Sequence, residues 1–226
     1  MDIKLFYREA GQGEYLILLH GNGEDSDYFV HQIEYFKKYY HVIAIDTRGH
    51  GKSERGSKPF TIRQFADDLY EFMIEHNIRK ANLLGFSDGG NIAMIFAMNH
   101  SELVDHLILN GANLNGKGVK ARFQIPIILG YKLCRASAKK NAKVLRNAEL
   151  LALMVNDPNV SVSELSKIKN PTLVIAGTRD MIKTSHTRLI AKNIKQAKLA
   201  ILQGDHFIAN KESDQFNQVI HDFLSL

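Results

Sequence analysis

Short apolar segments recur along this chain of 226 residues, and longer segments with helical periodicity separate them. Each apolar segment indicates a strand buried on both faces, because its hydrophobic residues follow one another with little alternation. The segments with this pattern are residues 3–7, 15–20, 40–46, 81–84, 104–110, 171–177 and 198–203. Strands of this kind that alternate with helices predict an α/β fold, in which a mostly parallel sheet is covered by helices on both faces.

Local signals refine this pattern at several points. The first two apolar segments flank Gly11-Gln12-Gly13, so we expect an antiparallel hairpin there. Thr61 and Gln64 have the spacing of a capping box, and apolar residues follow at helical spacing as far as Met73. A helix is therefore predicted from Thr61. Another helix is predicted at residues 214–224, where it closes the chain.

One long stretch breaks the alternation of strands and helices. Residues 113–166 have mostly helical signals and no clear strand. We predict a small helical cap over this range, inserted after the sixth strand, with residues 1–112 and 167–226 forming the α/β core. Open α/β sheets bind ligands at the carboxyl edge of their strands, so we expect the cap to lie over that edge.

The positive charge of the chain is concentrated in the predicted cap. The net charge is +5, yet residues 117–150 contain nine Lys or Arg and a single acid, Glu149. A solvated basic face is the simplest interpretation. There are two functional interpretations, in which the basic residues attract either an anionic substrate or an acidic membrane surface. We expect no nucleic-acid partner, because no recognition module is visible and aromatic residues do not interleave the basic ones.

The sequence also bears on compartment and chemistry. We expect no membrane span, because no uncharged apolar run approaches the length that a spanning helix needs. The first residues lack the basic-then-apolar order of a secretory signal, and the single cysteine, Cys134, allows neither an internal disulfide nor a metal cluster. A cytoplasmic location is the simplest expectation. The oligomeric state leaves no signature in the sequence.

The segment Gly85-Phe86-Ser87-Asp88-Gly89 has the pattern G-x-S-x-G. An apolar strand precedes it and a helix-compatible run follows it, which is the context of a sharp strand-to-helix turn. Such a turn lifts the Ser87 hydroxyl above the sheet and needs glycines on both sides. The hydroxyl then lies near a helix N-terminus, which favours a developing anion. We expect Ser87 to be a nucleophile.

A serine nucleophile needs a base, and the base needs an orienting acid. Asp180 lies in the turn after one late strand, and His206 follows the last strand. The order Ser, Asp, His along the chain is the order expected for this motif. We predict that His206 is the general base and then the general acid, and that Asp180 orients its ring. Asp205 is the rival orienter, although it adjoins His206 and is expected to point away.

The reaction also needs donors for an oxyanion. One is predicted to be the backbone N–H of Asp88, the residue after the nucleophile. The second is predicted to be the backbone N–H of Asn22, because His20-Gly21-Asn22-Gly23 follows an apolar strand and its glycines allow close approach of the backbone.

Taken together, these motifs resemble those of the α/β-hydrolase superfamily. The resemblance covers nearly the whole chain outside the cap and rests on residues 20–23, 46–53 and 85–90 together with Asp180 and His206. It implies no cofactor and no metal, and it implies that residues 113–166 shape the pocket. The elbow resembles that of biphenyl-hydrolase-like esterases, in which an acid beside the nucleophile can hold a substrate amine; here that acid is Asp88. The alternative interpretation is that Asp88 is favoured by the helix dipole.

We therefore predict a serine hydrolase that cleaves a small carboxylic ester through an acyl-enzyme intermediate. Hydrolysis of a thioester, an amide or a C–C bond stays open, because the same machinery serves all of them. A ligand-sensing or signalling protein that keeps the triad is the alternative from another class. A basic cap favours an anionic substrate, whereas an amine held by Asp88 favours a cationic one, and the sequence leaves both open.

Overall fold

The computed structural model describes residues 2–137 and 141–225, so Lys139 and Lys140 of the basic segment lie outside the described residues. Within the described part, seven strands form one sheet in the order β1-β3-β2-β4-β5-β6-β7. The strands are β1 (Tyr7–Ala10), β2 (Tyr15–Leu19), β3 (His41–Ile45), β4 (Ala81–Phe86), β5 (Val104–Asn110), β6 (Thr172–Gly177) and β7 (Ala197–Leu202). All neighbouring pairs are parallel except β1 with β3. The predicted mostly parallel sheet is therefore confirmed.

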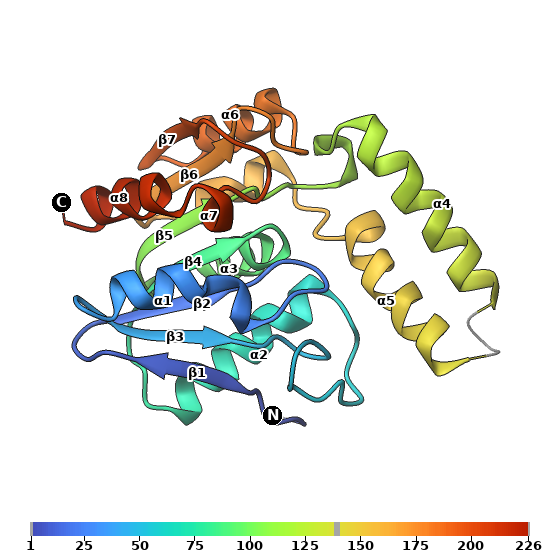
Figure 1. Cartoon of the computed structure of the whole chain (residues 1–226), viewed down its shortest axis with the longest axis horizontal. Coiled ribbons are helices and arrows are strands. Elements are labelled where there is room, and N and C mark those ends of the chain that lie inside the picture. Colours follow the sequence, from blue (N-terminus) through green and yellow to red (C-terminus); the bar gives the residue numbers. More distant parts are fainter. Residues whose placement is uncertain (1, 138–140, 226) are drawn as a thin grey trace.

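Helices cover both faces of this sheet (Figure 1). One core cluster joins the sheet to α2 (Ile62–Glu75), α3 (Asp88–Asn99) and α6 (Thr184–Asn193). A second cluster on the other face joins it to α1 (Val30–Phe36), α7 (Ile208–Lys211) and α8 (Ser213–Leu224). Short 3-10 helices are also present at Ser26–Phe29, Ser101–Leu103, Gly116–Gly118 and Val162–Lys167. The central strands are buried on both sides, which explains their continuous apolar sequence.

The expected hairpin between the first two strands is wrong. β1 pairs with β3, where Tyr7 faces Ile45, and β2 lies between β3 and β4 in parallel register. Residues Leu16–Leu19 of β2 are at most 1% exposed, whereas β1 is only partly buried. In a hairpin, β2 would pair with β1, which is only partly buried and cannot cover it. The buried strand β3 pairs with β2 instead, and β1 lies at the edge of the sheet.

The helix predicted from Thr61 is present as α2. The Thr61 hydroxyl accepts a hydrogen bond from the Gln64 backbone N–H (3.2 Å), as an N-cap does. The Gln64 side chain donates to Asp68 (3.0 Å), one turn further along the helix. The predicted apolar stripe of α2 is buried against the sheet, from Ile62 to Met73.

A helical hairpin projects beyond the carboxyl ends of the strands (Figure 1). It consists of α4 (Ala121–Ser137) and α5 (Ala142–Asn156), and α5 lies between α4 and the sheet. The segment follows β5, the fifth strand in chain order, and not the sixth as predicted. After α5 the chain returns to the core, where Leu165 joins the same cluster as α3 and α6. The division into core and cap at residues 113 and 166 stays a prediction.

Candidate active site

The turn between β4 and α3 has a strained backbone at Ser87. Its φ is +54° and its ψ −117°, a conformation that L residues rarely adopt. A Cβ at Gly85 would lie 2.2 Å from the Gly89 carbonyl oxygen, and one at Gly89 would lie 1.9 Å from the Leu19 carbonyl oxygen. Both glycines are therefore required by close backbone packing. The turn leaves Ser87 partly exposed at the start of α3.

Three side chains from distant parts of the chain meet at this turn. The Ser87 Oγ lies 3.0 Å from His206 Nε2, and His206 Nδ1 lies 2.7 Å from Asp180 Oδ1. Asp180 follows β6 and His206 follows β7, so the sheet brings both to the edge where β4 ends. His206 is 6% exposed and Asp180 is 1% exposed. The structure thus brings the three residues predicted from sequence into one hydrogen-bonded chain.

Further contacts fix the acid and the ring. Asp180 Oδ1 also accepts a hydrogen bond from the Ile182 backbone N–H (2.8 Å). Gly111, with a φ of +63°, lies against the ring, and a Cβ there would be 2.7 Å from the His206 Cε1. Asp205 does not contact the His206 ring in any described hydrogen bond. It accepts from the Phe207 N–H (2.9 Å) and pairs with Lys211 (2.5 Å) at the surface.

The loop after β2 lies beside the start of α3. The Gly21 N–H donates to Glu24 Oε2 (3.1 Å) and the Glu24 N–H donates to the Gly21 carbonyl (3.3 Å), which closes a turn around Asn22. Among the described residues, the Asn22 N–H finds no hydrogen-bond acceptor. Asp88 is the first residue of α3, where an N–H has no partner within its helix. Both predicted donors are therefore available to an anion.

A side-chain bond that the sequence did not predict ties these two donors together. Asn22 Nδ2 donates to Asp88 Oδ2 (2.9 Å) and also to the Leu150 carbonyl on α5 (2.9 Å). Asn91 Nδ2 approaches the other Asp88 oxygen (3.4 Å). The Asn22 side chain therefore connects the loop after β2 both to α3 and to the helical hairpin. No pattern in the sequence predicts that a single asparagine in a loop makes these side-chain hydrogen bonds.

Several carboxyl groups near the site have raised pKa values. Burial raises the pKa of Asp88, and the amides of Asn22 and Asn91 oppose this effect. Burial also raises the pKa of Asp157 to about 6, and the nearby charge of Asp88 adds to it. On the other side, burial raises the pKa of Glu24 to about 7, while the Gly21 N–H acts against it.

Two stacked aromatic rings pack against one side of the His206 ring. The Tyr28 ring lies parallel to Phe86 with centroids 4.5 Å apart, and Phe86 lies 4.9 Å from the His206 ring. Phe86 immediately precedes Ser87, and its ring contacts both Tyr28 and the ring of His206. This packing limits the orientations that the imidazole can adopt.

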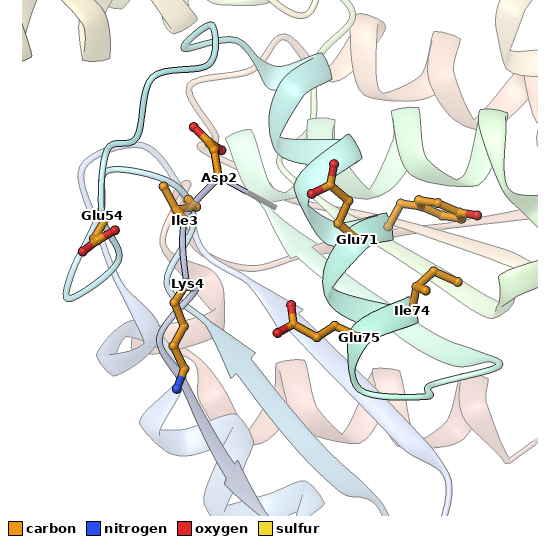
Figure 2. Close-up of a pocket in the computed structure, with 8 residues that line it drawn as sticks. Asp2, Ile3, Lys4, Glu54, Glu71, Ile74 and Glu75 are labelled. Carbon is orange, nitrogen blue, oxygen red and sulfur yellow. The ribbon is translucent and has the colours of Figure 1, made fainter.

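One pocket of the structure lies away from these residues. It has a volume of about 730 Å³ and lies between the N-terminal segment and α2, with Asp2, Glu54, Glu71 and Glu75 among its lining residues (Figure 2). Its walls do not include Ser87, Asp180 or His206.

Within the described residues, no group of three or more His, Cys, Asp or Glu side chains has the arrangement of a metal site. In the same residues, no helix has the length and apolar character to cross a membrane.

Comparison with known proteins decides the family. The sequence model of the alpha/beta hydrolase fold matches residues 14–132, which is more than half of the chain. The chain belongs to the alpha/beta hydrolase fold family. This agrees with the resemblance seen in its motifs.

Relatives extend the similarity to most of the chain. Human serine hydrolase BPHL is 26% identical over 247 residues, covering 98% of this chain and 83% of BPHL. The (E)-2-((N-methylformamido)methylene)succinate hydrolase of Acinetobacter baylyi is 38% identical over 106 residues, covering 46% of this chain and 40% of that protein. The enol-lactonase of Burkholderia xenovorans LB400 superposes with a TM-score of 0.84 at 22% identity, covering 99% of this chain and 97% of that one. The first two of these proteins are named as hydrolases, which agrees with the predicted hydrolase, and the third shows the same fold.

Proposed function

We propose that this protein is a serine hydrolase that cleaves a small carboxylic ester through an acyl-enzyme intermediate. One observation carries the proposal: the hydrogen-bonded chain from Ser87 Oγ to His206 Nε2 (3.0 Å) and from His206 Nδ1 to Asp180 Oδ1 (2.7 Å). The strained backbone that exposes the Ser87 hydroxyl supports the assignment of Ser87 as nucleophile.

In the proposed reaction, Ser87 Oγ forms a bond to the ester carbonyl carbon while His206 Nε2 takes the hydroxyl proton. The carbonyl oxygen becomes an oxyanion. The C–O bond to the alcohol then breaks, and His206 returns the proton to the departing oxygen. Water attacks the acyl-enzyme with His206 again as base, which releases the acid and restores Ser87. Asp180 holds the ring and stabilises its cationic form.

The oxyanion is proposed to bind the backbone N–H groups of Asn22 and Asp88. Removing one donor of this kind typically raises the barrier by about 3 kcal/mol. The hydrogen bond from Asn22 Nδ2 to Asp88 Oδ2 (2.9 Å) supports a close placement of the two donors. We propose that this contact sets the width of the oxyanion site.

The test is hydrolysis of p-nitrophenyl acetate by Ser87→Ala, with Ser225→Ala as the matched control at an exposed serine beyond α8. Ser87→Ala is expected to lose turnover and labelling by a fluorophosphonate while keeping the wild-type unfolding temperature. Undiminished hydrolysis by a folded Ser87→Ala protein would end the proposal. An unlabelled wild-type Ser87, with a ligand that still raises the unfolding temperature, would favour the ligand-sensing alternative.

A substrate ammonium group is a second candidate feature, favoured by the two carboxyl groups of Asp88 and Asp157. Their pKa values are raised, so an adjacent cation would favour the ionised form of each. Comparison of an aminoacyl ester with its desamino and carboxylated counterparts tests this. Preference for the ammonium substrate that Asp157→Asn removes would support it, and preference for the carboxylated ester would favour the anionic alternative raised by the basic segment.

A further inference from the structure

The outer helix of the hairpin exposes a continuous apolar stripe. Ile125, Leu129 and Leu133 are spaced four residues apart on α4, and they are 56%, 56% and 72% exposed. Residues four apart lie on the same face of a helix. A helix of a globular domain normally buries such a stripe against its core. Here the apolar stripe faces solvent.

The opposite side of α4 makes the contacts with its neighbour. Gln124 is buried, and its Nε2 donates to the Met154 carbonyl on α5 (3.2 Å). A Cβ at Gly130 would lie 3.5 Å from the Leu151 side chain. The packing of α4 on α5 is therefore satisfied without the exposed stripe, so the stripe is not the face by which the hairpin holds together.

Basic residues flank the stripe. The helix contains Arg122, Lys132 and Arg135 and has no Asp or Glu. At the helical rotation of about 100° per residue, Lys132 lies about 60° from Leu129 at the edge of the stripe, and Arg122 lies about 20° from Leu129 at the N-terminal end of the stripe. An exposed apolar stripe edged by basic residues is the pattern of helices that lie in the plane of a membrane surface.

The position of α4 leaves this face accessible. Figure 1 shows α4 as the outermost element of the hairpin, with α5 between it and the sheet. The charge of the chain is also unevenly distributed. The described residues of α4 and α5 include five bases and one acid, whereas the chain outside residues 117–150 has 20 bases and 23 acids. A negatively charged surface would therefore attract the hairpin side of the molecule and repel the rest.

We propose that the exposed face of α4 binds the surface of an anionic lipid bilayer. Ile125, Leu129 and Leu133 insert at the boundary between headgroups and acyl chains, and Arg122 and Lys132 contact lipid phosphates. A second copy of the chain is the less suitable occupant, because it would bring two basic helices together. The proposal concerns a surface outside the candidate active site and does not depend on the ester chemistry.

The experiment is co-sedimentation of the full chain with two kinds of vesicles, phosphatidylcholine alone and phosphatidylcholine with phosphatidylglycerol, at 50 and 500 mM NaCl. The protein is expected to sediment with the anionic vesicles at low salt and to be released at high salt. Equal binding to both kinds of vesicles, or no binding to either, would overturn the proposal.

Matched variants distinguish the effect of the α4 stripe on vesicle binding from that of exposed apolar side chains elsewhere on the protein. Leu129→Ser with Leu133→Ser is expected to lower binding at least fivefold. Ile74→Ser with Val30→Ser, at side chains 54% and 49% exposed on the core, is expected to leave it unchanged. Figure 2 shows Ile74 on α2, beside Glu71 and Glu75. Equal loss in both double variants would refute a specific role for α4.

Charge variants and solution size complete the test. Arg122→Gln with Lys132→Gln is expected to reduce binding at 50 mM NaCl and to weaken its dependence on salt. Circular dichroism checks that each variant is folded. If sedimentation velocity without lipid shows a dimer that Leu129→Ser with Leu133→Ser abolishes, the stripe belongs to an interface between copies and the membrane proposal is wrong.

Discussion

Replacement of Asp180 by asparagine isolates the charge of the proposed orienting acid. Asp180 Oδ1 receives two contacts, from His206 Nδ1 (2.7 Å) and from the Ile182 N–H (2.8 Å). An asparagine has nearly the same shape and can keep its oxygen toward both donors. The Asp180→Asn variant therefore removes the negative charge, together with the long hydrogen bond (3.4 Å) that Asp180 Oδ2 accepts from the Gly177 N–H.

The size of the effect follows from the burial of the pair. The side chains of His206 and Asp180 are 7% and 1% exposed, so the effective dielectric constant is closer to about 20 than to that of water. In the proposed reaction His206 becomes a cation, with its charge centre about 4 Å from that of the carboxylate, which corresponds to about 4 kcal/mol of attraction. Each 1.36 kcal/mol is tenfold in rate, so kcat/KM is expected to fall about 1000-fold.

The assay is kcat/KM for p-nitrophenyl acetate, measured together with the unfolding temperature. Asp205→Asn is the matched control, because Asp205 is next to His206 in sequence but pairs with Lys211 at the surface. It is expected to change kcat/KM less than twofold. A loss below tenfold in a folded Asp180→Asn protein would refute the electrostatic reasoning. An equal loss in both variants would show that the two carboxylates share the orienting role.

Two further predictions concern stability. Arg48→Met removes a fully buried guanidinium that makes two 2.7 Å bonds to Asp68, and it is expected to lower the free energy of urea unfolding by about 3–5 kcal/mol. Arg8→Met, which breaks only the exposed pair with Asp27, is expected to cost about 0–1 kcal/mol, and equal losses would contradict the role of burial. Burial raises the pKa of Glu24 to about 7 from 4.5, so the folded state holds a proton that the unfolded state releases, and stability is expected to fall as pH rises from 5 to 8. Glu24→Gln is expected to flatten that dependence in thermal unfolding, and parallel curves for the two proteins would contradict it.

The arrangement of the candidate site could be predicted from sequence because a parallel sheet imposes it. Ser87, Asp180 and His206 each follow a strand, and the carboxyl ends of parallel strands meet at one edge. Each position needed only a local signal, a strand and the turn after it. The glycines beside Ser87 could be predicted for the same reason, since their requirement is set within a single turn.

The pairing of β1 could not be predicted in the same way. The glycines between β1 and β2 are a local turn signal, but the neighbour of a strand is chosen by burial across the whole sheet. A Cβ at Gly11 would lie 2.2 Å from the Tyr40 carbonyl oxygen, so this turn packs against the chain just before β3. The glycine serves a contact with a segment about thirty residues away along the sequence and not a hairpin.

The polar side chains around the site were also beyond sequence reasoning. The sequence predicts a role for the Asn22 backbone N–H, whereas in the structure its side chain donates to both Asp88 and the Leu150 carbonyl. Glu24 had no signal, although it accepts the Gly21 N–H and closes the turn around Asn22. Loop residues of this kind have no periodicity, and their partners are fixed only when distant segments pack together.

The strain at Ser87 connects the fold to the proposed chemistry. A non-glycine residue in such a conformation costs on the order of 1–3 kcal/mol and persists only where the surroundings determine it. Here Gly85 and Gly89 allow β2, β4 and α3 to approach so closely that the turn between them has no room to relax. A glycine at position 87 would remove the strain and also the hydroxyl. The presence of serine at this position is what we expect if the packing of the turn serves to hold the Ser87 hydroxyl in place at the cost of backbone strain.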